Sequence, residues 1–136
     1  MGQPVTPSAL YLIREVFGIA DYPLPEESLT VEHDGRCVSH VGLFWRTIHL
    51  ERHGPLEVGG IGLVCTATGW RRLGLATALL EAARRRSALH GRPHLALYAG
   101  EAESALYRSL GYQPTNVQHL LAFPPVGRVA DTGGEW

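Results

Sequence analysis

The sequence predicts an α/β protein of the α+β kind: a mixed, mostly antiparallel twisted sheet with helices on both faces. Three observations predict it. Alternating, β-rich runs fill most of the first half of the chain, a long helix and a short apolar strand follow, and a short helix and a further β-rich stretch come last. Its 136 residues, 45% of them apolar, suit one domain over residues 1–136.

The first half begins with a helix and continues with strands. Apolar residues recur at helical spacing over residues 7–19, and two prolines then break the pattern. From residue 29 the runs become β-rich, and the Asp34-Gly35 pair between two of them predicts a hairpin. A second turn near residue 54 leads into a glycine-containing run that ends at Thr66.

The second half changes from hairpins to a strand–helix–strand unit. We expect a long helix over residues 73–89, a strand over residues 94–99 and a short helix over residues 102–110. The arginine run 84–86 is expected on a solvated face of the long helix. After Gly111 the pattern indicates one more strand or a hairpin, and a tail rich in glycine and proline is expected to be irregular.

Composition excludes several classes of function. The formal net charge of −1 gives no field that would draw the protein to nucleic acid or an anionic membrane. No apolar run approaches the roughly 20 residues of a membrane helix, and the first residues lack the basic and apolar regions of a secretory signal. Cys37 and Cys65 lie in apolar strand-like runs, so we expect buried free thiols and a cytoplasmic location.

The loop between Thr66 and the long helix predicts a phosphate site. It contains Gly69 and Gly74 and opens directly into the helix, where unpaired N–H groups and the positive end of the helix dipole meet. That geometry binds phosphate. A plain crossover loop with a solvated arginine pair is the alternative, because glycine-loop motifs match by chance.

Glycines inside the preceding strand predict a bend. Gly59, Gly60 and Gly62 interrupt a run of valine, isoleucine and leucine, and strand glycines mark a bulge or a close backbone approach. A strand bent there would splay from residues 94–98 and open a wedge of unpaired backbone groups. An extended chain with amides, such as the pantetheine arm of coenzyme A, would pair with them. A bulge needed only for sheet curvature is the alternative.

Two patterns resemble the GNAT superfamily of acyltransferases. The family carries Q/R-x-x-G-x-G/A after its fourth strand, and the segment 71–76, RRLGLA, fits every fixed position. Residues 105–112, ALYRSLGY, look like the family's A-x-x-Y-x-x-L-G-F/Y helix and turn. The segments 38–46, 58–74 and 105–114 look most like the aminoglycoside 2′-N-acetyltransferases.

The resemblance implies a GNAT-like fold with splayed central strands and acetyl-CoA as the acyl donor. It implies pantetheine against the backbone of the strand residues Val64, Cys65 and Thr66. It implies pyrophosphate on the loop and first helical turn, which comprise Arg71, Arg72, Leu73, Gly74, Leu75, Ala76 and Thr77. Thr68 stands where relatives often have proline, Ala102 where many have asparagine, and neither Gly60 nor Gly62 supplies the glutamate that some relatives use as base.

Acyl transfer to an amine needs a base, an oxyanion site and an acid for the leaving thiolate. The resemblance implies Tyr107 near the thioester sulfur, where its phenol would serve as the acid, with a buried core tyrosine as the alternative. A backbone N–H near Val64 would hold the oxyanion. Glu57, His40 or a chain of waters would serve as base, and the sequence does not distinguish among these three. The histidines show no metal spacing, so no metal is predicted.

We therefore expect an acetyl-CoA-dependent N-acetyltransferase that acts directly on a primary amine of a small molecule or peptide. Neither nucleic acid nor membrane is expected as partner, and a homodimer is left open. A non-catalytic acyl-CoA-binding module is the main alternative. A P-loop nucleotide binder is disfavoured because no Lys-Ser/Thr pair follows Gly74.

Overall fold

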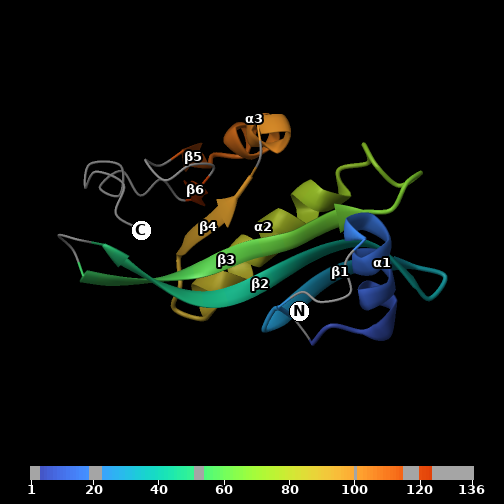
Figure 1. Cartoon of the computed structure of the whole chain (residues 1–136), viewed down its shortest axis with the longest axis horizontal. Helices are drawn as coiled ribbons and strands as arrows, with labels where there is room; N and C mark the ends of the chain where they lie inside the picture. Colours follow the sequence, from blue (N-terminus) through green and yellow to red (C-terminus); the bar gives the residue numbers. More distant parts are fainter. Residues whose placement is uncertain (1–3, 19–22, 51–53, 100, 115–119, 124–136) are drawn as a thin grey trace. The chain divides into compact units, whose positions relative to one another are not determined.

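The computed structural model describes residues 4–18, 23–50, 54–99, 101–114 and 120–123, and it has the predicted mixed α/β fold (Figure 1). The elements in chain order are α1 (Pro7–Phe17), β1 (Glu27–His33), β2 (Arg36–Leu50), β3 (Gly54–Thr66), α2 (Leu75–Leu89), β4 (His94–Tyr98), α3 (Glu101–Ser109), β5 (Gln113–Pro114) and β6 (Leu120–Phe123). The sheet order is β1-β2-β3-β4-β6-β5. The stretch after Gly111 is therefore a hairpin, and the predicted irregular tail lies outside the described residues.

Two compact units divide the chain, and each is described by itself. The first unit comprises Met1–Phe44 and Ile61–Arg86, and the second comprises Trp45–Gly60 and Ser87–Trp136. Strands β2 and β3 and helix α2 each run from one unit into the other. The predicted wedge between β3 and β4 beyond Gly60 would lie between the units, so it stays a prediction.

The β1–β2 hairpin forms where the sequence predicts it. Asp34 and Gly35 both have positive φ, 51° and 76°, as a two-residue turn between twisted antiparallel strands requires. The pairing joins Val31 to Ser39 but Glu32 to Cys37, which leaves one extra residue on β2 at a bulge.

Helix α1 is defined by its caps. The Thr6 side chain accepts a hydrogen bond from the Ala9 N–H at 3.2 Å, and Pro7 fits the first helical turn. Gly18 takes a left-handed conformation, φ 70°, and its N–H donates to the Arg14 carbonyl. The helix thus ends at Phe17, earlier than the predicted residue 19, because Gly18 caps it.

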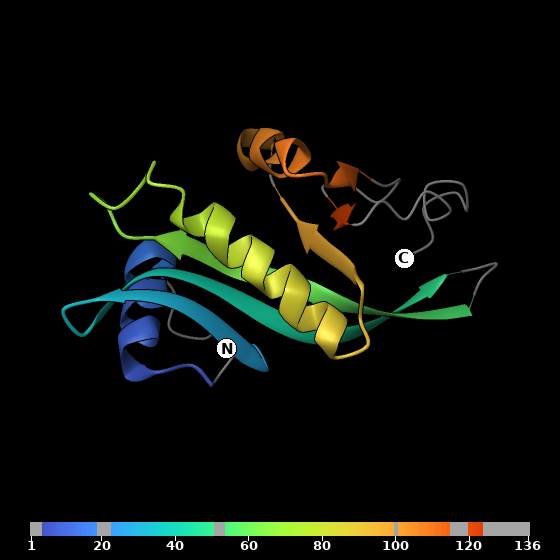
Figure 2. The same ribbon diagram turned by 180° about the vertical axis from the view of Figure 1, so that it is seen from behind.

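Helices α1 and α2 lie on opposite faces of the first unit's strands (Figures 1 and 2). On the α1 face, Ala9, Leu12 and Ile13 pack against Cys37 and Cys65. Both cysteines are buried free thiols, as predicted. Burial raises the pKa of Cys37 from 9.0 to about 11 and that of Cys65 to about 12.

These thiols should make the protein lose stability in alkali. The pKa of each thiol is higher in the folded than in the unfolded chain. The contribution of the protonated Cys37 thiol to the free energy of unfolding is therefore fully present below pH 9.0 and is lost as the pH rises toward about 11. We expect each thiol to lower the free energy of unfolding by roughly 1.4 kcal/mol per pH unit in that window. Urea unfolding at a series of pH values measures the slope, and replacing both cysteines with alanine should flatten it. An equal slope in the double variant would show that the thiols do not titrate as described.

Two strand glycines make room for neighbouring side chains, and the bulge predicted at residues 59–62 stays a prediction. A Cβ on Gly59 would come within 2.9 Å of Ser87 Cβ and 3.0 Å of Leu95 Cδ2, and one on Gly62 within 2.8 Å of Phe44 Cε1. Gly59, Gly60 and Gly62 are not among the residues with positive φ. The residues of β3 that do have positive φ are Gly54, its first residue, and Leu63, φ 51°, which directly follows Gly62.

Gly59→Ala should destabilise the second unit by overpacking. The new methyl group would collide with Ser87 and Leu95, both buried, and such collisions cost about 1–3 kcal/mol. Chemical denaturation of the variant measures the loss. Adding Ser87→Ala should recover part of it, because the serine oxygen is the atom nearest the new methyl group. Wild-type stability in Gly59→Ala would contradict this packing.

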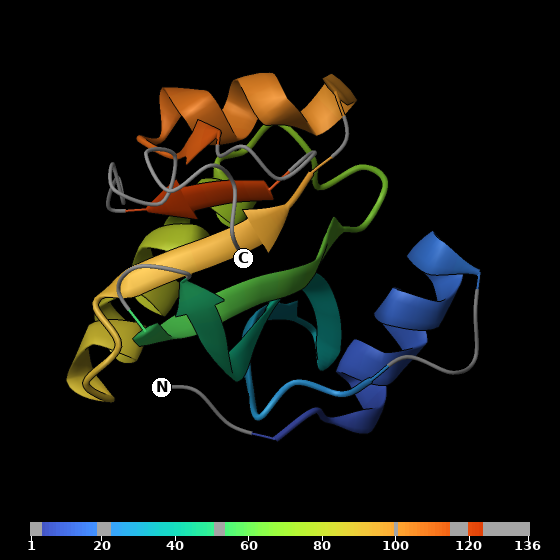
Figure 3. The same ribbon diagram turned by 60° about the vertical axis from the view of Figure 1, so that its left-hand side comes forward.

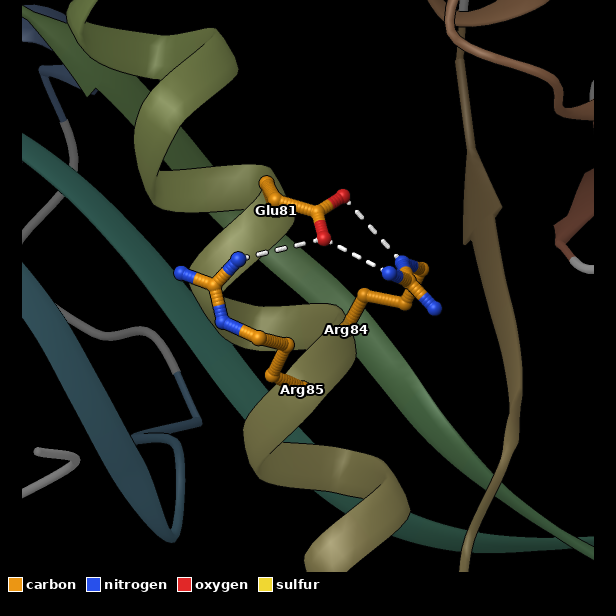
Figure 4. A network of polar contacts seen from close by, with 3 residues as sticks. All are labelled: Glu81, Arg84 and Arg85. Atoms are coloured by element: carbon orange, nitrogen blue, oxygen red, sulfur yellow. Dashed lines mark hydrogen bonds and ion pairs between the residues drawn. The ribbon is translucent and has the colours of Figure 1, made fainter.

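The arginine run of α2 is partly solvated and partly not. Arg84 and Arg85 both bind Glu81, with closest distances of 2.6 and 3.2 Å (Figure 4). The Arg84 guanidinium lowers the pKa of that carboxyl. Arg86 instead donates to both carboxylate oxygens of Glu27, at 2.6 and 3.0 Å, with the two side chains only 23% and 13% exposed. The predicted solvated face is therefore wrong for Arg86, which ties α2 to β1.

In the second unit, β6 pairs antiparallel with both β4 and β5, with Leu95 opposite Phe123 and Gln113 opposite Ala122 (Figure 3). Val58 and Ala96 form a small core with Ile48 and Leu56 packed against it.

Candidate active site

The loop between β3 and α2 has the backbone of an anion site. Gly69, Arg72 and Gly74 all have positive φ, 92°, 65° and 79°. Left-handed residues alternating with others turn successive N–H groups toward one concavity, and such concavities bind anions. Gly74 needs its freedom here, because a left-handed conformation costs other residues about 1–2 kcal/mol.

Helix α2 begins directly after this loop. Its first hydrogen bond runs from the Ala78 N–H to the Gly74 carbonyl at 3.0 Å, so the N–H groups of Leu75, Ala76 and Thr77 have no acceptor within the helix. A Cβ built on Gly74 meets no atom within 4 Å, and Leu73 is 63% exposed. The helix N-terminus is thus open to a ligand from solvent.

The loop is closed at its base by three hydrogen bonds. The Ala67 N–H donates to Val38 O at 2.8 Å, and the Trp70 N–H donates to Ala67 O at 3.0 Å. Arg71 Nε donates to Thr66 O at 3.1 Å. Arg71 therefore folds back over the loop that follows β3, with its side chain exposed.

Strand β3 carries the other predicted cofactor residues, Val64, Cys65 and Thr66, directly after Leu63. Ser39 of β2 supports their backbone, because its hydroxyl donates to the Cys65 carbonyl at 3.3 Å and lies 2.9 Å from Thr66 Oγ1. Loop and strand end thus form one continuous segment of the first unit, as the sequence predicts.

His40 contacts Leu63, the residue of β3 that has a φ of 51°. Its side chain is fully buried, Nδ1 lies 2.8 Å from the Leu63 carbonyl, and Nε2 lies 2.8 Å from Ser28 Oγ. A carbonyl only accepts, so Nδ1 carries the proton and Nε2 accepts from the serine hydroxyl. Burial lowers the pKa of His40, which favours this neutral form.

Tyr107 lies on α3 in the second unit and is only 7% exposed. Its ring meets Tyr112 edge to face, with centroids 5.7 Å apart. Burial, and secondarily the charge of Glu103, raises the pKa of Tyr107. The phenol therefore keeps its proton beyond pH 10.0, the state that a proton donor needs.

Glu57, on β3 in the second unit, is 63% exposed and forms an ion pair with Arg92 at 2.9 Å. Arg92 also donates to the carbonyls of Arg46 and Val58, and its guanidinium lies 5.6 Å from the ring of Trp45. The carboxylate of Glu57 thus belongs to a cluster centred on a structural arginine.

A pocket of about 850 Å³ borders the loop in the first unit. It lies between α1, the β1–β2 turn and the loop, and its ionisable and aromatic lining residues are Tyr11, Glu15, His33, Asp34, Arg36, Cys37, Trp70 and Arg71. The rings of His33 and Trp70 are 4.8 Å apart. The lining holds two carboxylates and two guanidinium groups, so its charge favours neither an anion nor a cation.

Within the described ranges, no group of three or more histidine, cysteine or acidic residues could hold a metal ion. Among the helices described, none is both long and apolar enough to cross a membrane.

The sequence matches the family described as acetyltransferase (GNAT) domain over residues 2–115, well over half of the chain. The chain belongs to this GNAT acetyltransferase family. No curated protein sequence matches it. Two of the loop's positive-φ residues, Arg72 and Gly74, lie within the segment 71–76 that resembles the family pattern.

Solved GNAT-type structures share the fold. An acetyltransferase from Trypanosoma brucei is 22% identical, with a TM-score of 0.63 over 79% of this chain and 84% of that one. Glucosamine-6-phosphate N-acetyltransferase from Arabidopsis thaliana is 10% identical, with a TM-score of 0.67 over 87% and 94%. A probable N-acyltransferase from Enterococcus faecalis is 16% identical, with a TM-score of 0.68, but this chain spans only 32% of its length.

Sequence reasoning missed Leu63 and Ser28. A leucine after three strand glycines gives no sign that it takes the left-handed conformation itself. Ser28 lies twelve residues from His40, and only the β1–β2 pairing brings the two together.

Proposed function

We propose that this GNAT protein transfers an acetyl group from acetyl-CoA directly to a primary amine. The observation that carries the proposal is the open start of α2 behind a left-handed loop, in a chain that belongs to an acetyltransferase family. The residues fit the donor, because a pyrophosphate needs convergent N–H groups and a helix N-terminus supplies them.

In this proposal the segment from Arg71 to Thr77 holds the pyrophosphate. The N–H groups of the first helical turn and the side chain of Arg72 would contact it. The backbone of Val64, Cys65 and Thr66 would pair with the amides of the pantetheine arm as a neighbouring strand does.

Tyr107 is the proposed acid. When the amine nitrogen attacks the thioester carbonyl and the C–S bond breaks, the thiolate needs a proton, and the phenol supplies it. The phenol is protonated at neutral pH, as the role requires, and the burial that raises its pKa makes it a weaker acid than an exposed tyrosine. A backbone N–H near Val64 is the proposed oxyanion donor.

For the base we retain Glu57 or a chain of waters. Glu57 is exposed and would exchange Arg92 for an incoming ammonium. We drop His40, because Ser28 and Leu63 engage both of its ring nitrogens and the side chain is fully buried.

The proposed acceptor is an amine of a small molecule or a peptide, and aminoglycosides belong in the first panel because of the resemblance in the sequence. The free thiols of Cys37 and Cys65 support a reducing compartment, and we place the reaction in the cytoplasm. A homodimer is compatible with this proposal.

Thiol release tests the proposal. The protein is incubated with acetyl-CoA and a panel of amines, free coenzyme A is followed with a thiol reagent, and the acetylated amine is identified by mass spectrometry. Release that depends on both the amine and the protein is expected. Tight acetyl-CoA binding without turnover on any amine would instead favour the non-catalytic binding module.

A further inference from the structure

The left-handed conformation of Leu63 within β3 needs an explanation. Leucine has no intrinsic preference for φ 51°, and such conformations persist only where their surroundings enforce them. The side chain of Leu63 packs against the apolar cluster under α1, which restrains one end of the residue. Its carbonyl is restrained by a hydrogen bond.

His40 supplies that second restraint. The imidazole is fully buried, and its Nδ1–H donates to the Leu63 carbonyl at 2.8 Å. Ser28, itself 1% exposed, donates to Nε2 at 2.8 Å and thereby fixes the tautomer. A buried chain of two hydrogen bonds thus runs from β1 through β2 to the backbone of β3.

We propose that His40, oriented by Ser28, is a positioning residue that holds Leu63 in the left-handed conformation and so presents the backbone of residues 64–66 to acetyl-CoA. The inference rests on the proposed function for the identity of the ligand. The left-handed conformation of Leu63 and the two hydrogen bonds of His40 are present whichever ligand the protein binds.

Two near-isosteric variants separate the two nitrogens. An asparagine amide places a donor near the position of histidine Nδ1, whereas a glutamine amide places its donor near Nε2. His40→Asn should keep the φ-dependent NMR coupling of Leu63 and wild-type affinity for acetyl-CoA by calorimetry. His40→Gln should shift the coupling and weaken affinity about tenfold, the factor that corresponds to the left-handed penalty.

A second change tests the cause. In a Leu63→Gly background the left-handed conformation has no steric penalty, so His40→Gln should cost little further affinity. Any of three results would overturn the proposal. The first is a loss of affinity in His40→Gln that is as large in the Leu63→Gly background as in the wild type. The second is an equal loss of affinity in His40→Asn and His40→Gln, and the third is a coupling of Leu63 that neither variant changes.

The wild-type protein provides a test that needs no variant. Imidazole ¹⁵N spectra should show His40 protonated at Nδ1, and an Nε2–H tautomer would overturn the proposal even if the variants fail to fold. If the wild-type protein does not bind acetyl-CoA, the proposed function fails, while the tautomer and the Leu63 coupling still decide whether His40 holds Leu63 in the left-handed conformation.

Discussion

Replacing Gly74 with glutamate is expected to abolish the binding of coenzyme A while the chain stays folded. The residue lies at the start of α2, where the N–H groups of the first turn point, and a carboxylate there would face the pyrophosphate. We expect affinity to fall roughly a hundredfold or more. Folding should survive, because a side chain at this position meets open space and the positive φ costs only about 1–2 kcal/mol.

Gly74→Gln and Gly74→Asn are the matched controls. Glutamine has the size of glutamate without the charge, and asparagine tolerates the left-handed conformation. Calorimetry with coenzyme A should rank the affinities as wild type, asparagine, glutamine and then glutamate. A folded glutamate variant with unchanged affinity would mean that the pyrophosphate does not bind at this loop.

Tyr107→Phe is expected to lower turnover by about 100- to 10,000-fold with little change in affinity for acetyl-CoA. The phenol is buried and carries its proton at neutral pH, so a proton is present for the departing thiolate. Phenylalanine keeps the ring and its edge-to-face packing on Tyr112. The loss should therefore appear in kcat and leave cofactor binding intact.

Tyr112→Phe is the control for the loss of a buried hydroxyl. Tyr112 is as buried as Tyr107 and touches the same ring, but no role in proton transfer is proposed for it. Full activity of Tyr107→Phe at every pH, or equal losses in the two variants, would remove Tyr107 from the mechanism.

Local signals in the sequence account for the features that were predicted well. The Asp34-Gly35 turn follows from the φ values that such a hairpin demands, and both residues have them. The backbone of the loop before α2 follows in the same way from Gly69 and Gly74, whose left-handed conformations few other residues adopt cheaply, and its binding of phosphate stays a prediction.

Features that depend on tertiary contact were missed or misread. The glycines at 59 and 62 suggested a bulge, which stays a prediction, and gave no sign that they make room for Ser87 and Phe44, which are distant in sequence. The left-handed conformation of Leu63 was missed, because its side chain packs under α1 and its carbonyl accepts from His40, and both partners are distant in sequence. Arg86 was misplaced for the same reason, because its partner Glu27 lies on another element.

A structure of the protein with bound acetyl-CoA would show directly where the acyl donor lies. We predict the pyrophosphate on the N–H groups from Gly74 to Thr77 and the pantetheine arm along Val64 to Thr66, in a slot where β3 parts from β4. A ligand bound elsewhere, with the start of α2 facing solvent and β3 paired to β4 along residues 59–66, would contradict it.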